Sequence, residues 1–261
     1  MTIDFNNQPY KKTGNTIGIQ IVNGANVTFK NADIDADYRV AMVAQNSTLT
    51  IESGTYKSGD CAIQASNNGH LIINDGDFTA QEFAVIAFNQ GTTVEINGGD
   101  FTAIDNAVIG GNGTATSGGT TMVINGGTFR GNITSNGYIA CGIYHPQNGE
   151  LIVNGGTFEV TNGVGILVRG GQVVINDVNV TTTGNVQGKV GDSRVLTDCS
   201  ALYVDGVSSY PGWSNCHVTV NDGHYVTDAG TKTVTVTVPE GEDPHDRLEI
   251  KGGTFSGDID F

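Results

Sequence analysis

The chain has 261 residues, of which 38 are glycine, and a formal net charge of −15. Glycine is about twice as frequent as in an average soluble protein, and the surplus of Ile, Val, Thr and Asn excludes a helical bundle or coiled coil. The acidity argues against nucleic acid and anionic membranes as partners, because only 12 Lys and Arg residues are available to neutralise phosphate groups.

Residues 1–16 precede the first clear repeat, and we expect them to form an N-terminal arm or cap. They show no basic region followed by an apolar run, so no secretory signal is predicted. No segment approaches the ~20 apolar residues that a membrane helix needs, so we expect no membrane insertion.

An eight-residue pattern occurs nine times in the rest of the chain, for example at Leu71–Phe78 (LIINDGDF) and Met122–Phe129 (MVINGGTF). The last residues of successive copies are 22, 22, 23, 28, 29, 22, 45 and 30 residues apart. A base period of 22 residues with insertions between the copies is typical of a solenoid. We therefore predict a domain spanning residues 17–261, with a long loop insertion at 181–217.

Each copy is interpreted as short strands joined by tight corners. Residue Asn97 of the pattern VEINGGDF opens one corner, and we expect it to adopt the left-handed backbone region and to bond the same residue one coil away. The predicted asparagine ladder contains Asn74, Asn97, Asn125, Asn154, Asn176 and Asn221. The aromatic residue that ends most copies predicts an interior stack. A further strand aligns as Cys61-Ala62-Ile63, Ala84-Val85-Ile86 and Ala107-Val108-Ile109 in successive coils.

Over about residues 17–255 the chain resembles a right-handed parallel β-helix of the pectate-lyase-like type, which has coils of this length and asparagine at a tight corner. The resemblance implies an all-β solenoid, here of about nine coils. It is specific for fold and not for function, since this fold carries lyases, hydrolases, viral spikes and adhesins. The Asn-Thr-Asp, Asp-Asp, Gly-His-Gly and Arg-Ile-Lys motifs that a resemblance to its hydrolases would imply are absent.

One candidate catalytic pair remains. Asp77 and Asp100 occupy the same position in successive copies, and two carboxylates ~5 Å apart can act as an acid/base pair. Because threonine fills the same position in other copies, we favour a solvent-facing polar ladder and expect no catalytic residues and no metal site. No cofactor is predicted.

The insertion at 181–217 holds the candidate ligand-binding residues. It contains the single tryptophan of the chain, and the candidates are Trp213, Tyr210, Tyr203, Arg194 and Asp192. These side chains predict either a sugar-stacking platform or a folded loop whose aromatic residues pack against the rod. Cys199 and Cys216 lie in the same region, and the sequence leaves open whether they pair.

These features favour a non-enzymatic structural or adhesive protein. The C-terminal phrase Gly252–Asp258 (GGTFSGD) resembles repeats of gut Firmicutes surface proteins and of phage virion components. The resemblance implies a virion head fibre, decoration protein or tail-spike-like module made in the host cytoplasm. Its expected partners are further copies of the chain, as in a trimer, other virion proteins and a host surface polysaccharide. The alternatives are a polysaccharide lyase or glycoside hydrolase of this fold, and an extracellular adhesin module of a bacterial cell surface.

Overall fold

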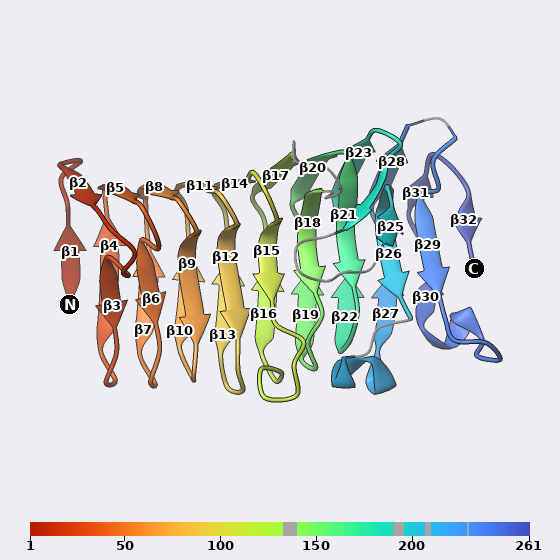
Figure 1. Ribbon diagram of the computed structural model, residues 1–261, viewed down its shortest axis with the longest axis horizontal. Helices are drawn as coiled ribbons and strands as arrows, with labels where there is room; N and C mark the ends of the chain where they lie inside the picture. The colour runs from red at the N-terminus through yellow and green to blue at the C-terminus, as the bar shows by residue number, and fades with distance from the viewer. Residues whose placement is uncertain (133–139, 190–195, 207–209, 229) are drawn as a thin grey trace.

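The computed structural model describes residues 1–132, 140–189, 196–206, 210–228 and 230–261. Three ten-stranded parallel sheets, named here A, B and C, form the long faces of a parallel β-helix. The chain begins at one end of this rod and ends at the other (Figure 1). Each coil contributes one strand to each sheet, which confirms the solenoid that the repeat predicts.

Sheet A contains, in order along the rod, β1 (Thr2–Asp4), β4 (Asn26–Lys30), β7 (Thr48–Ile51), β10 (His70–Ile73), β13 (Thr93–Ile96), β16 (Thr121–Ile124), β19 (Glu150–Val153), β22 (Gln172–Ile175), β27 (His217–Val220) and β30 (Leu248–Ile250). Sheet B contains β2 (Pro9–Lys12), β5 (Ala32–Ala36), β8 (Gly54–Ser58), β11 (Asp77–Ala80), β14 (Asp100–Ala103), β17 (Thr128–Asn132), β20 (Thr157–Thr161), β23 (Asn179–Thr183), β28 (His224–Thr227) and β31 (Thr254–Phe255). Sheet C contains β3 (Ile19–Ile21), β6 (Ala41–Val43), β9 (Cys61–Ser66), β12 (Phe83–Phe88), β15 (Ala107–Gly111), β18 (Ala140–His145), β21 (Gly163–Val168), β26 (Ser200–Asp205), β29 (Val234–Thr237) and β32 (Ile259–Asp260). Outside the sheets lie the antiparallel pair β24 (Gln187–Lys189) and β25 (Leu196–Asp198) and the short 3₁₀ helices η2 (Pro211–Asn215) and η3 (Pro244–Asp246).

The first coil is built from the residues that we predicted as an arm or cap. Strands β1 and β2 pair in parallel with β4 and β5, and Tyr10 lies opposite Ile34. The structure therefore has one coil more than the nine copies of the pattern. Because an end strand has a neighbour on one side only, its residues need not match the interior pattern, and Tyr10 is 41% exposed.

The predicted insertion 181–217 contains a complete strand of sheet C, β26. The described additional residues lie in two loops on either side of that strand, at 184–189 and 196–199 before it and at 206 and 210–216 after it. The first loop includes β24 and β25, and the second includes η2. The coil therefore keeps its three strands, and the described additional residues lie outside the three ten-stranded sheets.

The interior of the rod is a column of stacked apolar side chains. From Tyr56 to Phe158, five successive aromatic rings stack with centroids 4.6 to 4.9 Å apart and planes within 12° of parallel. The column follows the strand register of sheet B, so one aromatic residue per coil produces a continuous stack. Val180 interrupts it, and Tyr225 and Phe255 form a further pair beyond.

The corner between sheets A and B carries the asparagine ladder on its outer surface. The Nδ2 of each asparagine donates to the Oδ1 of the residue one coil earlier, with distances of 2.7 to 2.9 Å from Asn97 to Asn221. The first amide, of Asn74, donates to the carboxylate of Glu52 at 3.2 Å. All the side-chain N–H groups therefore point toward the N-terminal end of the rod, where a negative charge receives them.

The backbone of this corner differs from the prediction. The six ladder asparagines are not among the residues with positive φ, and after five of them the left-handed residue is the glycine two positions later, such as Gly99 with φ of 107°. After Asn176 this position is Val178, which does not have a positive φ. A Cβ on Gly99 would lie 2.8 Å from the carbonyl oxygen of Gly76 in the previous coil. The close approach of the coils at Gly99 therefore leaves no room for a side chain, while asparagine supplies the side-chain bond.

The register of sheet C corrects one predicted alignment. Val85, and not Ile86, lies opposite Ile63 and Ile109, so the aligned residues of that coil begin at Phe83. A shift by one residue exchanges the two faces of a strand. Ile86 consequently lies in the outer column, opposite Gln64.

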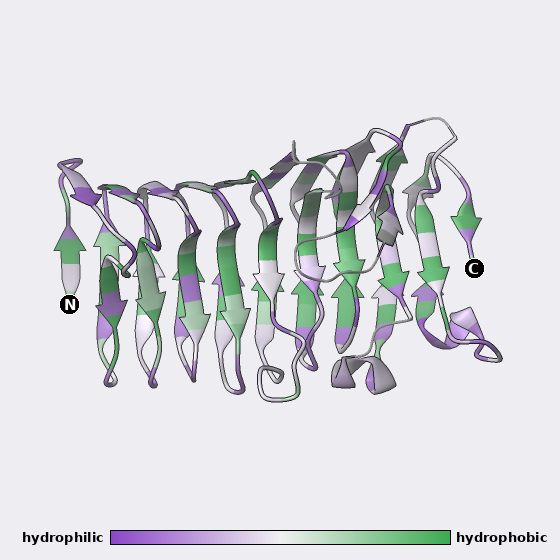
Figure 2. Cartoon of the chain, viewed as in Figure 1, coloured by the Kyte–Doolittle hydropathy of each residue, from purple (hydrophilic) through white to green (hydrophobic). Residues whose placement is uncertain are grey.

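Sheet C is covered on both faces over much of its length. Every residue of β9, β18, β21 and β26 is buried, and Figure 2 shows hydrophobic segments along these strands. A second apolar cluster, separate from the interior, contains Tyr144, Leu167 and Tyr203. Since Ile166 and Val168 belong to the interior cluster, alternation places Leu167 and its neighbours on the outer face.

Candidate functional site

The outer face of sheet B carries the carboxylates that the sequence singled out. One column of directly opposed residues runs Asp33, Thr55, Asp77, Asp100, Thr128, Thr157, Asn179, His224 and Thr254. Asp77 and Asp100 are direct neighbours on β11 and β14. Adjacent strands lie ~4.8 Å apart, so the two carboxyl groups are placed at the spacing of a catalytic pair.

Asp100 is engaged in a three-membered ionic cluster. Arg130 Nη1 lies 2.8 Å from Asp100 Oδ1, and Arg130 Nε lies 2.9 Å from Glu159 Oε2. The hydrogen bond to Asp100 is the main cause that raises the pKa of Arg130. All three side chains are about half exposed, so the cluster contributes little to stability.

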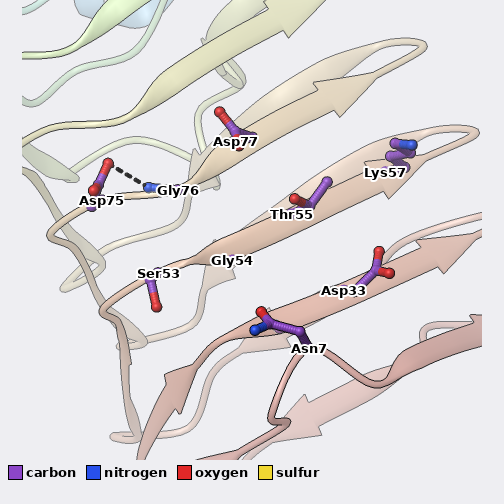
Figure 3. A pocket seen from close by; sticks show the side chains of 10 residues that line it. Asn7, Asp33, Ser53, Gly54, Thr55, Lys57, Asp75, Gly76 and Asp77 are labelled. Atoms are coloured by element: carbon purple, nitrogen blue, oxygen red, sulfur yellow. Dashed lines mark hydrogen bonds between the residues drawn. The ribbon is translucent and has the colours of Figure 1, made fainter.

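Asp77 borders a hollow of about 560 Å³ at the N-terminal part of sheet B. Asp33, Asp75 and Lys57 also line it. Figure 3 shows Asp33, Thr55 and Asp77 following one another on three strands, with Asp75 Oδ1 turned toward the backbone N–H of Gly76, which donates to it at 2.8 Å. The hollow is therefore a polar surface with more carboxylates than cations.

The aromatic residues of the insertion are packed against the rod. Trp213 is 8% exposed, and the guanidinium of Arg247 lies 4.5 Å from its ring centroid. Arg247 also donates to the carbonyl oxygens of Trp213 and Cys216. Tyr203 is 6% exposed. Neither ring offers an open face on which a sugar could stack.

Tyr210 belongs to a network around a buried arginine. Arg169 Nε donates to Asp205 Oδ2 at 2.6 Å, and its Nη1 donates to Tyr144 Oη at 2.9 Å. The Arg169 guanidinium lies 4.8 Å from the centroid of the Tyr210 ring. Arg169 and Asp205 are at most 3% exposed, so a buried ion pair joins the ends of β21 and β26 in sheet C, and Tyr210 of the insertion packs on its guanidinium.

Sequence reasoning did not select Arg169 and Asp205, although a signal for them existed. Val168 lies opposite Val204 in the register of β21 and β26, so the residues that follow share the next position. Aligning the two coils places an arginine beside an aspartate there. Asp192 and Arg194, which were selected, lie outside the described residues.

The cysteines are all free and buried. Cys199 and Cys216, whose pairing the sequence left open, are thus separate thiols in this structure, and burial raises the pKa of Cys216 to about 12. Burial similarly raises the pKa of Cys61 to about 12. A thiol that remains protonated is a poor nucleophile.

Within the described ranges, no group of three or more His, Cys, Asp or Glu side chains is arranged to hold a metal ion. In the same part of the chain, no helix has the length and apolar character needed to cross a membrane. Comparisons of the chain with protein-family models, with curated proteins and with solved structures found no match.

Proposed function

We propose that the protein is a non-enzymatic structural and adhesive rod, with its binding surface on the loops beside sheet C. The observation that carries this proposal is the unbroken stacking of ten coils in register. At ~4.8 Å per coil the stack is roughly 45 Å long. Such a rod is stiff, so it holds its binding surface at a fixed distance from the point where the protein is attached.

The outer polar residues support a structural use of the coils. The corner asparagines bond one another along the rod, and Asp100 is bound by Arg130. These side chains are occupied in joining one coil to the next. The net charge of −15 favours solubility of a molecule with so much sheet surface.

Within this proposal we place the rod in a phage virion, as a head fibre, decoration protein or tail-spike-like module. The support is the resemblance of the C-terminal phrase at Gly252–Asp258. Its partners would be further copies of the chain, other virion proteins and a polysaccharide of the host surface. Labelling purified phage particles with antibody to the chain tests this setting, and labelling of bacterial cell walls instead would favour the surface adhesin.

The absence of catalysis is tested by measuring binding and turnover together. The purified chain is applied to an array of bacterial surface polysaccharides, and reducing ends released from the same polysaccharides are measured. We expect retention on one or more polysaccharides without release of oligosaccharides. Time-dependent release that scales with protein concentration would overturn the proposal.

A polysaccharide-cleaving enzyme is the second candidate, favoured by the adjacent Asp77 and Asp100 and by the hollow beside them. It predicts that Asp77→Asn and Asp100→Asn each abolish release of oligosaccharides. Asp177→Asn, at an exposed corner, is the matched control and should leave release unchanged. Release that survives both changes would exclude this pair as the catalytic site.

A further inference from the structure

The corner between sheets C and A is short in most coils and long in a few. Residues 89–92, 146–149 and 169–171 make tight corners, whereas 112–120 and 206–216 are insertions at the same rim of the rod. Figure 1 shows both insertions at the lower edge, one after β15 and the other containing η2. Insertions on one rim of a solenoid are the usual place for a binding surface.

The two insertions meet although they follow β15 and β26, which have two other strands of sheet C between them. Backbone N–H of Gly171 donates to Gly212 O at 2.9 Å, and Asn215 Nδ2 donates to Asn148 Oδ1 at 2.9 Å. A Cβ on Gly113 would lie 2.6 Å from the ring of Tyr210. Residues 210–216 therefore lie against the two preceding coils and rest against loop 112–120.

A hollow of about 290 Å³ lies where they meet. Gln90 and Asn148 contribute amides to its wall, Thr114 contributes a hydroxyl, and Ala115 and Pro211 contribute apolar surface. No charged side chain is among the described residues that line it. This volume is at the lower end of the range of small-molecule sites, which is about 300–1,000 Å³.

Amide side chains lie in the wall and next to it in the sequence. Asn148 Oδ1 accepts a hydrogen bond from Asn215 Nδ2. Gln147, directly before it, is completely buried, and both of its amide atoms lack a partner among the described residues. A Cβ on Gly212, itself part of the wall, would lie 2.9 Å from the Gln147 carbonyl carbon. The Gln90 and Asn148 amides in the wall favour a ligand rich in hydroxyl groups.

We infer that this hollow binds a single neutral sugar unit of a longer glycan. Amide and hydroxyl groups match sugar hydroxyls, and Ala115 with Pro211 offers an apolar surface for the C–H face of a sugar ring. The described lining residues include no cation, and this together with the net charge of −15 disfavours an anionic sugar. This inference rests on the adhesive part of the proposed function and names its ligand class.

The test uses the full chain and simple sugars as probes. Methyl glycosides of glucose, galactose, mannose and N-acetylglucosamine are titrated by saturation-transfer NMR, with glucuronic acid as the anionic comparison. Ala115→Trp places an indole in the hollow, while Thr116→Trp changes the neighbouring exposed residue, which does not line it. We expect at least one neutral glycoside to bind with a dissociation constant in the millimolar range. Ala115→Trp should lower the affinity for that glycoside at least tenfold, and Thr116→Trp should leave the affinity unchanged.

Gln90→Ala removes one amide from an exposed position and should lower the affinity for the same glycoside three- to tenfold. Equal affinity in wild type and Ala115→Trp would overturn the assignment of the hollow while leaving the adhesive rod intact if the polysaccharide array still shows retention. Binding of none of the neutral glycosides would overturn the inference directly. Release of oligosaccharides on the array would instead overturn the proposed function, whatever the glycoside titration shows.

Discussion

The imidazole of His145 lies inside the coil, opposite Val168, and is 2% exposed. Its Nε2 has no hydrogen-bond partner among the described residues. Burial disfavours the charged form and lowers the pKa of His145 to about 4. At neutral pH the residue is therefore a neutral interior group.

This burial predicts a loss of stability in mild acid. The unfolded chain takes up a proton at His145 below the ordinary pKa of about 6.5, while the folded chain does so only near 4. The free energy contributed by neutral His145 is therefore present above pH 6.5 and is lost as the pH falls toward 4. Between pH 7 and pH 5 the loss should be about 2 kcal/mol.

Urea unfolding of wild type and His145→Gln at both pH values measures this contribution. Glutamine does not titrate, so the wild type should lose about 2 kcal/mol more than the variant between pH 7 and pH 5. The comparison cancels the contribution of the many carboxylates, which both proteins share. Parallel pH dependences would show that His145 does not titrate as its burial requires.

At the scale of elements, the ends of β21 and β26 are joined by Arg169 and Asp205. A charge left alone in a buried site costs far more than an exposed one. Tyr144 and Tyr210 extend the network to β18 and to the loop before η2. The second loop of the insertion therefore contacts this buried pair through the Tyr210 ring.

Arg169→Met should lower the free energy of unfolding by about 3–5 kcal/mol, because Asp205 loses its buried partner. The control is Arg130→Met, which removes an exposed arginine bound to Asp100 and should cost under ~1 kcal/mol. Both are measured by urea unfolding at pH 7. Equal losses would contradict a buried role for Arg169, and the double variant Arg169→Met with Asp205→Leu should recover much of the stability.

At the scale of the whole molecule, the asparagine ladder runs along the corner of successive coils and ends on Glu52. Each inner member both donates and accepts, as Asn125 does with Asn97 and Asn154 at 2.7 Å. Because each coil contacts mainly its neighbours, loss of one member weakens the contact between adjacent coils.

Asn125→Ala removes two of these bonds at an exposed position and should lower the free energy of unfolding by about 1 kcal/mol. Asn179→Ala is the matched control, since that side chain is exposed on sheet B and makes no hydrogen bond to the described residues. Differential scanning calorimetry of the two variants compares them. A loss in Asn179→Ala as large as that in Asn125→Ala would mean that the ladder adds no stability.

The sequence alone determined the coils and their columns. A pattern repeated every 22 residues places chemically similar residues opposite one another, so Phe78 stacks on Phe101 and Asn97 bonds Asn125 wherever the chain keeps its period. It did not reveal the first coil, where Tyr10 stands in an end strand with weaker constraints. It also did not reveal that a glycine such as Gly99, and not the asparagine before it, takes the left-handed backbone at the corner between sheets A and B. The coils approach closely at this glycine.

Only the tertiary structure decided what the insertions do. The candidates Trp213 and Tyr203 are buried, and the hollow between Thr114 and Pro211 arises from loops that begin three coils apart. A strand's partners follow from the repeat, because adjacent coils must satisfy each other's backbone hydrogen bonds. A loop outside the sheets has no such constraint, so its reach across neighbouring coils depends on packing that no periodic pattern encodes.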